Sequence, residues 1–149
     1  MGKAVLVTGG SGFLGINMVR HLLERGETDV RVLDIADFDY PEAGRVEFLK
    51  GDVRDRATVA RAMADVKWVV HTAAALPLYK PADIYSTEVG GTRILLEAAA
   101  AAGVGRFVHI SSTAVYGIPD HHPLLEDDKL DGVGPYGQAK IDAEAVCRE

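Results

Sequence analysis

The sequence predicts an α/β protein in which a doubly wound parallel sheet carries helices on both faces. Short apolar runs recur along the 149 residues, stretches that suit helices separate them, and apolar and polar residues do not alternate within the runs. Strands that are apolar on both sides are typical of a parallel sheet covered by two layers of helices. Right-handed crossovers between such strands favour the strand order 3-2-1-4-5.

The expected elements alternate along the whole chain. The runs that predict strands are residues 4–7, 30–33, 46–49, 68–70 and 106–110. Helical character follows in residues 13–25, 54–65, 84–102 and, from a helix start at Pro135, in 136–149. Residues 37–44 and 116–133 have the composition of loops. The last helix has no stop signal, so we expect that the chain is cut within a longer protein.

Glycines recur every third residue directly after the first expected strand. Gly9, Gly12 and Gly15 lead into the first expected helix. At such a corner the free N–H groups and the helix dipole attract an anion, and glycine lets a pyrophosphate approach the main chain closely. A P-loop needs Lys-Ser or Lys-Thr after its last glycine, but Ile16 and Asn17 follow here, which excludes that alternative.

An acidic residue ends the second expected strand. Asp34 lies nineteen residues beyond Gly15, where a carboxylate accepts hydrogen bonds from an adenosine ribose. The order of these features predicts a dinucleotide site: a strand, the three glycines, a helix, a second strand and an acidic residue at its end. The carboxylate would repel a 2′-phosphate, and residues 35–37 include no arginine to neutralise one, which favours NAD over NADP.

Tyr136 and Lys140 are four residues apart, so they share one face of the last expected helix. A free tyrosine has a pKa of about 10, and a neighbouring ammonium favours the phenolate. Ser112 follows the fifth expected strand and can orient a substrate oxygen by a hydrogen bond. A Tyr/Lys pair alone is common on helix surfaces. Because a dinucleotide site precedes them in the sequence, Ser112, Tyr136 and Lys140 together predict proton transfer from an alcohol that is bound beside a nicotinamide.

Composition restricts partners and location. The net charge is −6 and the lysines and arginines are scattered, which argues against nucleic acid or a membrane as partner. A single cysteine, Cys147, excludes an internal disulfide and suits a reducing compartment, and neither a signal peptide nor a membrane span is visible. We therefore expect a cytoplasmic protein. His121 and His122 are adjacent and lack a ligand partner at suitable spacing, so we expect no metal site.

Five motifs together resemble the extended short-chain dehydrogenase/reductases, and within them the NAD-dependent epimerase/dehydratase family of nucleotide-sugar epimerases and dehydratases. In order they are TGGSGFLG (8–15), GDV (51–53), HTAA (71–74), SSTAVYG (111–117) and PYGQAK (135–140). The resemblance covers the whole chain and implies a truncated Rossmann fold with NAD as cofactor. Residues 1–149 would be the NAD-binding domain, without the C-terminal portion that binds the substrate.

The resemblance also implies roles for individual residues. The glycines would hold the pyrophosphate, Asp34 the adenosine ribose and the Asp52-Val53 pair the adenine. Ser112, Tyr136 and Lys140 would form the catalytic triad. The residues implied to bind the cofactor are Gly9, Gly12, Phe13, Leu14, Gly15, Asp34, Asp52, Val53, Ala73, Ala74, Tyr136 and Lys140.

Glu88 departs from the family pattern, because it stands where relatives usually carry an asparagine, and its charge would alter a proton relay. Three functions stay open. The first is a nucleotide-sugar epimerase or dehydratase that works by transient hydride transfer with Tyr136 as acid and base. The second is a ketone or aldehyde reductase of the same superfamily, and the third a non-catalytic dinucleotide-binding module. The isolated chain should be inactive, and a homodimer through helices 84–102 and 136–149 is compatible with the resemblance.

Overall fold

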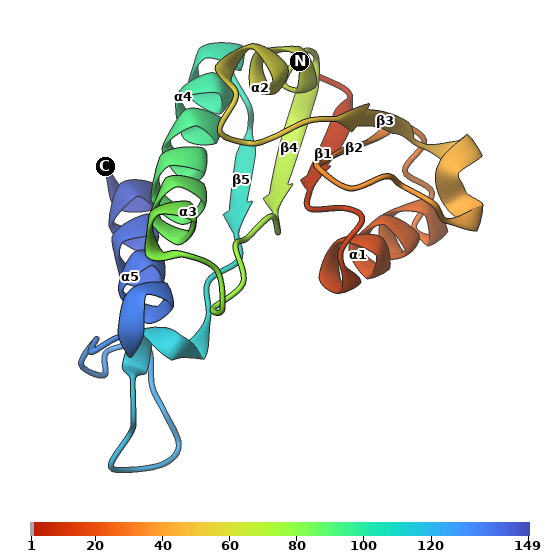
Figure 1. Ribbon diagram of the computed structural model, residues 1–149. Coiled ribbons are helices and arrows are strands. Elements are labelled where there is room, and N and C mark those ends of the chain that lie inside the picture. Colours follow the sequence, from red (N-terminus) through yellow and green to blue (C-terminus); the bar gives the residue numbers. More distant parts are fainter. Residues whose placement is uncertain (1) are drawn as a thin grey trace. The chain divides into compact units, whose positions relative to one another are not determined.

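The computed structural model describes residues 2–149, and these form two compact units. The first unit consists of residues 2–73 together with Ile94–Ile110, and the second of Ala74–Arg93 together with Ser111–Glu149. The whole β-sheet belongs to the first unit, whereas the second is built from helices and loops (Figure 1).

Within residues 2–149, five parallel strands form one sheet in the order β3-β2-β1-β4-β5. The strands are β1 (Ala4–Thr8), β2 (Val30–Asp34), β3 (Glu47–Lys50), β4 (Val66–His71) and β5 (Arg106–His109). Every residue of the central strand β1 is buried, as expected for an apolar run between two helix layers. The predicted fold class and strand order are confirmed.

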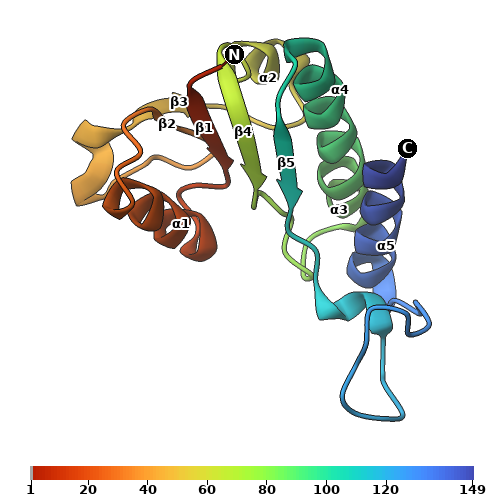
Figure 2. The same cartoon turned by 180° about the vertical axis from the view of Figure 1, so that it is seen from behind.

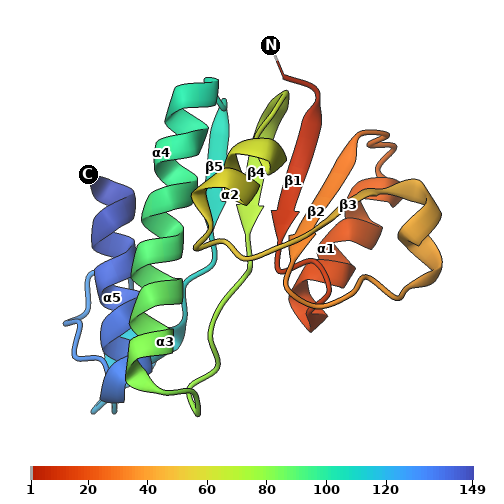
Figure 3. The same cartoon turned by 45° about the horizontal axis from the view of Figure 1, so that its top comes forward.

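Helices cover both faces of this sheet. Helix α1 (Phe13–Glu24) packs on one face, where its Val19 contributes to a buried cluster with Val7 and Val32. Helices α2 (Arg56–Ala62) and α4 (Thr92–Ala102) lie on the other face (Figure 3). The apolar stripe of each helix thus meets a strand surface that would otherwise be exposed to water.

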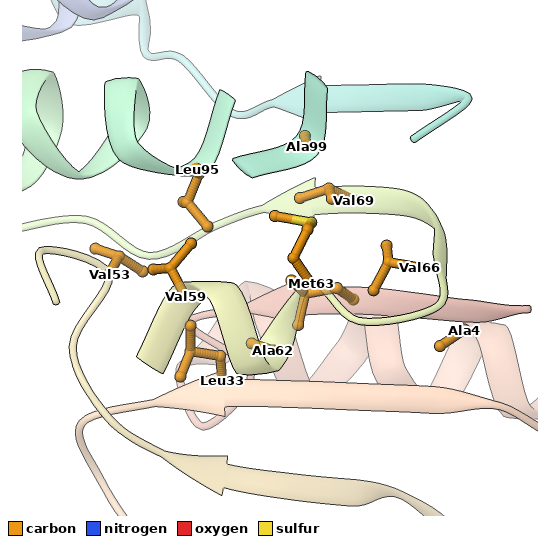
Figure 4. Packing of buried hydrophobic residues seen from close by; sticks show 11 residues of the cluster. Ala4, Leu33, Val53, Val59, Ala62, Met63, Val66, Val69, Leu95 and Ala99 are labelled. Carbon is orange, nitrogen blue, oxygen red and sulfur yellow. The ribbon is translucent and has the colours of Figure 1, made fainter. Parts of the chain in front are cut away.

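The larger buried cluster lies between the sheet, α2 and α4. Met63 is 2% exposed, and Val59, Leu33 and Leu95 are fully buried. Figure 4 shows Leu95 of α4 pointing toward Val59 of α2. Burial of each side chain of this size contributes about 1.5–3 kcal/mol. This packing holds the carboxyl ends of the strands in place.

The second unit contains α3 (Pro81–Tyr85), the π-helical turn η2 (Ser86–Gly91), the 3₁₀ turn η3 (Thr113–Tyr116) and α5 (Gly134–Arg148). Helices α3 and α5 lie side by side (Figure 2). Ile84 of α3 and Ala139 of α5 form a small core with Ala75.

The structure adds detail that the sequence did not predict. The helix expected at 84–102 begins at Pro81 and passes through the π-helical turn, where Gly90 and Gly91 weaken the α-helical pattern. The loop expected at 37–44 contains the 3₁₀ turn η1 (Pro41–Arg45), which starts at a proline with a suitable fixed φ. Among the described residues, no helix combines the length and apolar character needed to cross a bilayer.

Candidate cofactor and catalytic sites

The corner between β1 and α1 is bare main chain. Gly9 has a φ of +70°, and a Cβ atom there would lie 2.6 Å from the Ala73 nitrogen. A Cβ atom on Gly15 would lie 2.6 Å from the Cα atom of Gly10. Gly12 is the N-cap of α1 and has no side chain to bond the first N–H groups. Glycine is therefore required at this corner for steric reasons.

Side chains do not close the corner from outside. Gly12 is exposed, the Phe13 side chain is 88% exposed and the Leu14 side chain is 44% exposed. The 12-residue helix α1 thus presents free N–H groups and the positive end of its dipole. Such a helix end binds a phosphate group without further side chains. The geometry meets the steric and electrostatic needs of a pyrophosphate.

Asp34 lies directly beside this corner. Its Oδ2 accepts a hydrogen bond from the Ser11 N–H (2.9 Å), and its Oδ1 accepts one from the Ala36 N–H (2.9 Å). The Tyr40 hydroxyl donates to the Ser11 carbonyl (2.9 Å) and so fixes the glycine turn. The neighbouring cation Lys50 is ion-paired with Asp37 at 2.7 Å. Asp34 is thus held as an acceptor next to the predicted pyrophosphate site.

The tip of β4 is fixed against the tip of β1. His71 is 1% exposed, and its Nδ1 lies 2.7 Å from Thr8 Oγ1 in a hydrogen bond. The Ala73 N–H donates to the same hydroxyl at 3.3 Å. His71 therefore has a structural role, and Ala73 lies against Gly9 in the first unit. Ala74 belongs to the second unit.

Asp52 and Val53 follow β3 but have different surroundings. Val53 is 5% exposed and belongs to the main core cluster. The Arg54 side chain donates to both carboxylate oxygens of Asp52, at 2.6 and 3.0 Å. Hydrogen bonds from Arg54 lower the pKa of Asp52, partly opposed by its burial. An adenine amino group at this position would meet a carboxylate that already has a guanidinium partner.

The three predicted catalytic residues all belong to the second unit. Lys140 Nζ lies 5.8 Å from the centre of the Tyr136 ring, so both residues occupy one face of α5. The half-buried Tyr136 packs against the small core around Ala139. Ser112 is the N-cap of η3, where its hydroxyl accepts a hydrogen bond from the Ala114 N–H (3.2 Å). This hydroxyl can still donate a hydrogen bond to a substrate oxygen.

Lys140 also forms a buried ion pair, which the sequence did not predict. Its Nζ lies 2.8 Å from Glu88 Oε2, and the two side chains are 3% and 0% exposed. The other oxygen of Glu88 accepts a hydrogen bond from the Ala75 N–H (2.8 Å). The sequence singled out Glu88 only as a departure from the family pattern that the chain resembles, and nothing in the sequence identified its partner.

His121 lies between two carboxylates of an exposed loop. Its Nδ1 is 2.8 Å from Asp120, and its Nε2 is 3.0 Å from Asp128. The sequence did not predict these two contacts, because they arise where the loop folds back between residues 121 and 128. The hydrogen bond to Asp120, followed by the one to Asp128, raises the pKa of His121.

The sequence profile of the NAD-dependent epimerase/dehydratase family matches residues 5–149. The dTDP-glucose 4,6-dehydratase of Streptomyces antibioticus is 36% identical over 96% of the chain and 47% of its own length. A short-chain dehydrogenase/reductase superfamily protein from Agrobacterium tumefaciens, solved with bound NAD, superposes with a TM-score of 0.90 at 34% identity. That alignment covers 97% of this chain and 44% of that structure.

A second solved structure extends this likeness to an epimerase. The UDP-glucose 4-epimerase of Bifidobacterium longum, in complex with NAD+ and UDP, superposes with a TM-score of 0.86 at 32% identity, over 97% of this chain and 48% of that one. The chain spans between 37% and 50% of the lengths of the curated relatives that it matches. With the profile match, the sheet order and the glycine corner together, the chain belongs to the NAD-dependent epimerase/dehydratase family.

Proposed function

We propose that the chain is the NAD-binding part of an enzyme that epimerises or dehydrates a nucleotide sugar by transient hydride transfer. The bare main chain at the β1–α1 corner, with Asp34 bonded to its Ser11 N–H, carries this proposal. Relatives of the same family are a dTDP-glucose dehydratase and a UDP-glucose epimerase, which supports a nucleotide sugar as substrate class.

The residues of the first unit fit a dinucleotide. The N–H groups of the first turn of α1, from Phe13 onward, would hold the pyrophosphate, and Asp34 would accept bonds from the adenosine ribose through its remaining lone pairs. Asp52 and Val53 would border the adenine, and Ala73 and Ala74 the rest of the cofactor. When bound, NAD supplies a reversible acceptor for hydride from a sugar carbon.

The residues of the second unit would move the proton. Tyr136, as the phenolate, would take the proton from the sugar hydroxyl as the hydride leaves, and return it in the reverse step. The Lys140 ammonium, 5.8 Å from the ring centre, stabilises negative charge that develops on the phenol oxygen. Ser112 would orient the reacting oxygen by a hydrogen bond.

We further propose that residues 1–149 form the cofactor-binding domain and that a further portion of the protein binds the sugar. Trp68 and Val108 lie on the sheet face that α1 covers elsewhere, yet they are 45% and 40% exposed. Acrylamide should quench Trp68 fluorescence strongly in the isolated chain and weakly in the whole protein. Equal quenching in both would contradict cover by that further portion.

Cofactor preference can be tested on the chain itself. Calorimetric titration with NAD and with NADP should give clearly tighter binding of NAD, because Asp34 repels a 2′-phosphate. Asp34→Asn should reduce that preference, whereas Asp39→Asn, on the following loop, serves as the matched control. Equal affinity of the wild-type chain for the two cofactors would contradict the role of Asp34. The isolated chain should bind NAD without turning over a nucleotide sugar.

The proton-transfer role can be tested in the whole protein. Tyr136→Phe should lower kcat by about 10²- to 10⁴-fold, because it removes the phenol proton carrier. NAD affinity should change little, and Tyr79→Phe, at an exposed tyrosine, should leave kcat unchanged. Retained turnover in Tyr136→Phe would show that another group transfers the proton.

A further inference from the structure

Glu88 and Lys140 stand out from the other charged residues of the second unit. Within residues 2–149, no other aspartate, glutamate, lysine or arginine is buried, and these two are 0% and 3% exposed. Burial of a carboxylate and an ammonium is costly, and the cost is offset when the charges meet and the remaining polar atoms are bonded. Such a pair is therefore well defined in space.

The two carboxylate oxygens of Glu88 have different partners, and both partners are donors. The Ala75 N–H donates to Oε1, and the Lys140 ammonium lies 2.8 Å from Oε2. Apart from this ion pair, Oε2 has no hydrogen-bond partner within the part of the chain that is described. A glutamate offers two acceptors, whereas glutamine or asparagine offers one acceptor and an NH₂ group that would face a second donor.

Glu88 also fixes a side chain that would otherwise be mobile. The four-carbon stem of a lysine has many rotamers, and its ammonium finds partners from several directions. The ion pair holds the Lys140 ammonium 2.8 Å from Glu88 Oε2, at a place that is 5.8 Å from the centre of the Tyr136 ring. The same carboxylate holds the main chain at Ala75, next to the Ala74 position proposed to border the cofactor.

We infer that Glu88 is a positioning residue for the proton transfer: its carboxylate holds Lys140 beside Tyr136 and, through its second oxygen, the main chain at Ala75. This inference rests on the proposed function, because it assigns Glu88 to the same reaction. It explains why an acid occupies a buried position in η2, where an amide could satisfy only one of the two donors.

The first test needs no substrate. Lysine acetylation by acetic anhydride, followed by mass spectrometry, compares Lys140 in the wild-type chain and in Glu88→Gln. Loss of the carboxylate releases the Lys140 side chain from its fixed, buried position and lets it reach the reagent, so the labelling rate of Lys140 should rise by about tenfold. Lys129, 83% exposed, should keep its rate, and far-UV circular dichroism verifies the fold. An unchanged rate for Lys140 in a folded variant would overturn the inference.

The second test measures kcat and KM in the whole protein. Glu88→Gln should lower kcat by about 10- to 100-fold with little change in the KM of the sugar, because it misplaces Lys140 and leaves substrate contacts intact. Glu88→Asp keeps two acceptors and should retain more activity than Glu88→Gln, although glutamine is closer in shape. Glu97→Gln, at an exposed acid, is the matched control.

Equal or higher activity in Glu88→Gln than in Glu88→Asp would overturn the inference. Failure of the proposed function gives a different pattern. In that case the wild-type protein turns over no nucleotide sugar, and Glu88 has no reaction to serve, while the labelling test still decides whether Glu88 holds Lys140. Two results together support the proposed function and the positioning role of Glu88. The wild-type protein turns over a nucleotide sugar with much lower activity in Glu88→Gln than in Glu88→Asp, and Lys140 is labelled faster in Glu88→Gln.

Discussion

The buried ion pair predicts a large and specific loss of stability in Lys140→Met. Methionine keeps most of the apolar stem, so the substitution chiefly removes the ammonium from Glu88 Oε2. Glu88 is 0% exposed, and water cannot replace the lost partner. Removal of one member of such a pair costs about 3–5 kcal/mol. For a chain of this size that loss lowers the melting temperature by roughly 6–20 °C.

The double variant Glu88→Gln/Lys140→Met separates the charge from the shape of the pair. It removes both charges, so its free energy of unfolding should return to within about 1–2 kcal/mol of the wild type. Urea titration followed by circular dichroism measures the free energy of unfolding of the wild type, Glu88→Gln, Lys140→Met and the double variant. Arg56→Met breaks an exposed pair with Glu97 and should cost less than about 1 kcal/mol.

Two outcomes would refute this reasoning. One is a cost for Lys140→Met that matches the cost for Arg56→Met, because the environment of the pair would then be irrelevant. The other is an additive cycle, in which the double variant loses the sum of the two single losses. Additivity would mean that Glu88 and Lys140 are stabilised by separate contacts rather than by each other.

Three further predictions concern the corner, the core and the loop. Gly15→Ala should lower the free energy of unfolding by about 1–3 kcal/mol and abolish NAD binding in calorimetry, because its Cβ atom would lie 2.6 Å from the Cα atom of Gly10. Gly44 has open space around it, so Gly44→Ala should change neither the stability nor the binding of NAD. Met63→Ala should lower the free energy of unfolding by about 2–5 kcal/mol in urea titration. The NMR titration midpoint of His121 should lie above 6.5 and fall in Asp120→Asn. Because the folded-state pKa is raised, this contact stabilises the loop below about pH 6.5 and weakens as pH rises through that midpoint.

The fold was predictable because its strands are buried on both faces. Runs such as 4–7 and 30–33 are apolar without alternation, and this pattern together with right-handed crossovers leaves few strand orders. The glycine corner was predictable for a related reason: only glycine satisfies the close contacts at Gly9 and Gly15. Both features depend on local residue type and are therefore visible in one sequence.

The partner of Glu88 was not predictable, because it depends on contacts between segments that are distant in the chain. Lys140 follows Glu88 by 52 residues, and Ala75 precedes it by 13. The π-helical turn that carries Glu88 also departs from the 3.6-residue period on which the helix prediction relied. The contacts of His121 were missed similarly, since a loop that folds back leaves no periodic signal.

The two units therefore differ in the kind of substitution that they tolerate. In the first unit the proposed pyrophosphate contacts come from main-chain N–H groups, so an added methyl group at Gly15 is harmful, while the charge of Asp34 affects the choice between NAD and NADP. In the second unit the proposed chemistry comes from side chains around Lys140, so removal of a charge at Glu88 is harmful even when the shape is kept. Gly15→Ala should thus abolish NAD binding and leave the acetylation of Lys140 slow. Glu88→Gln should leave NAD binding intact and make the acetylation of Lys140 faster. A single variant at either position that produced both effects would contradict this division.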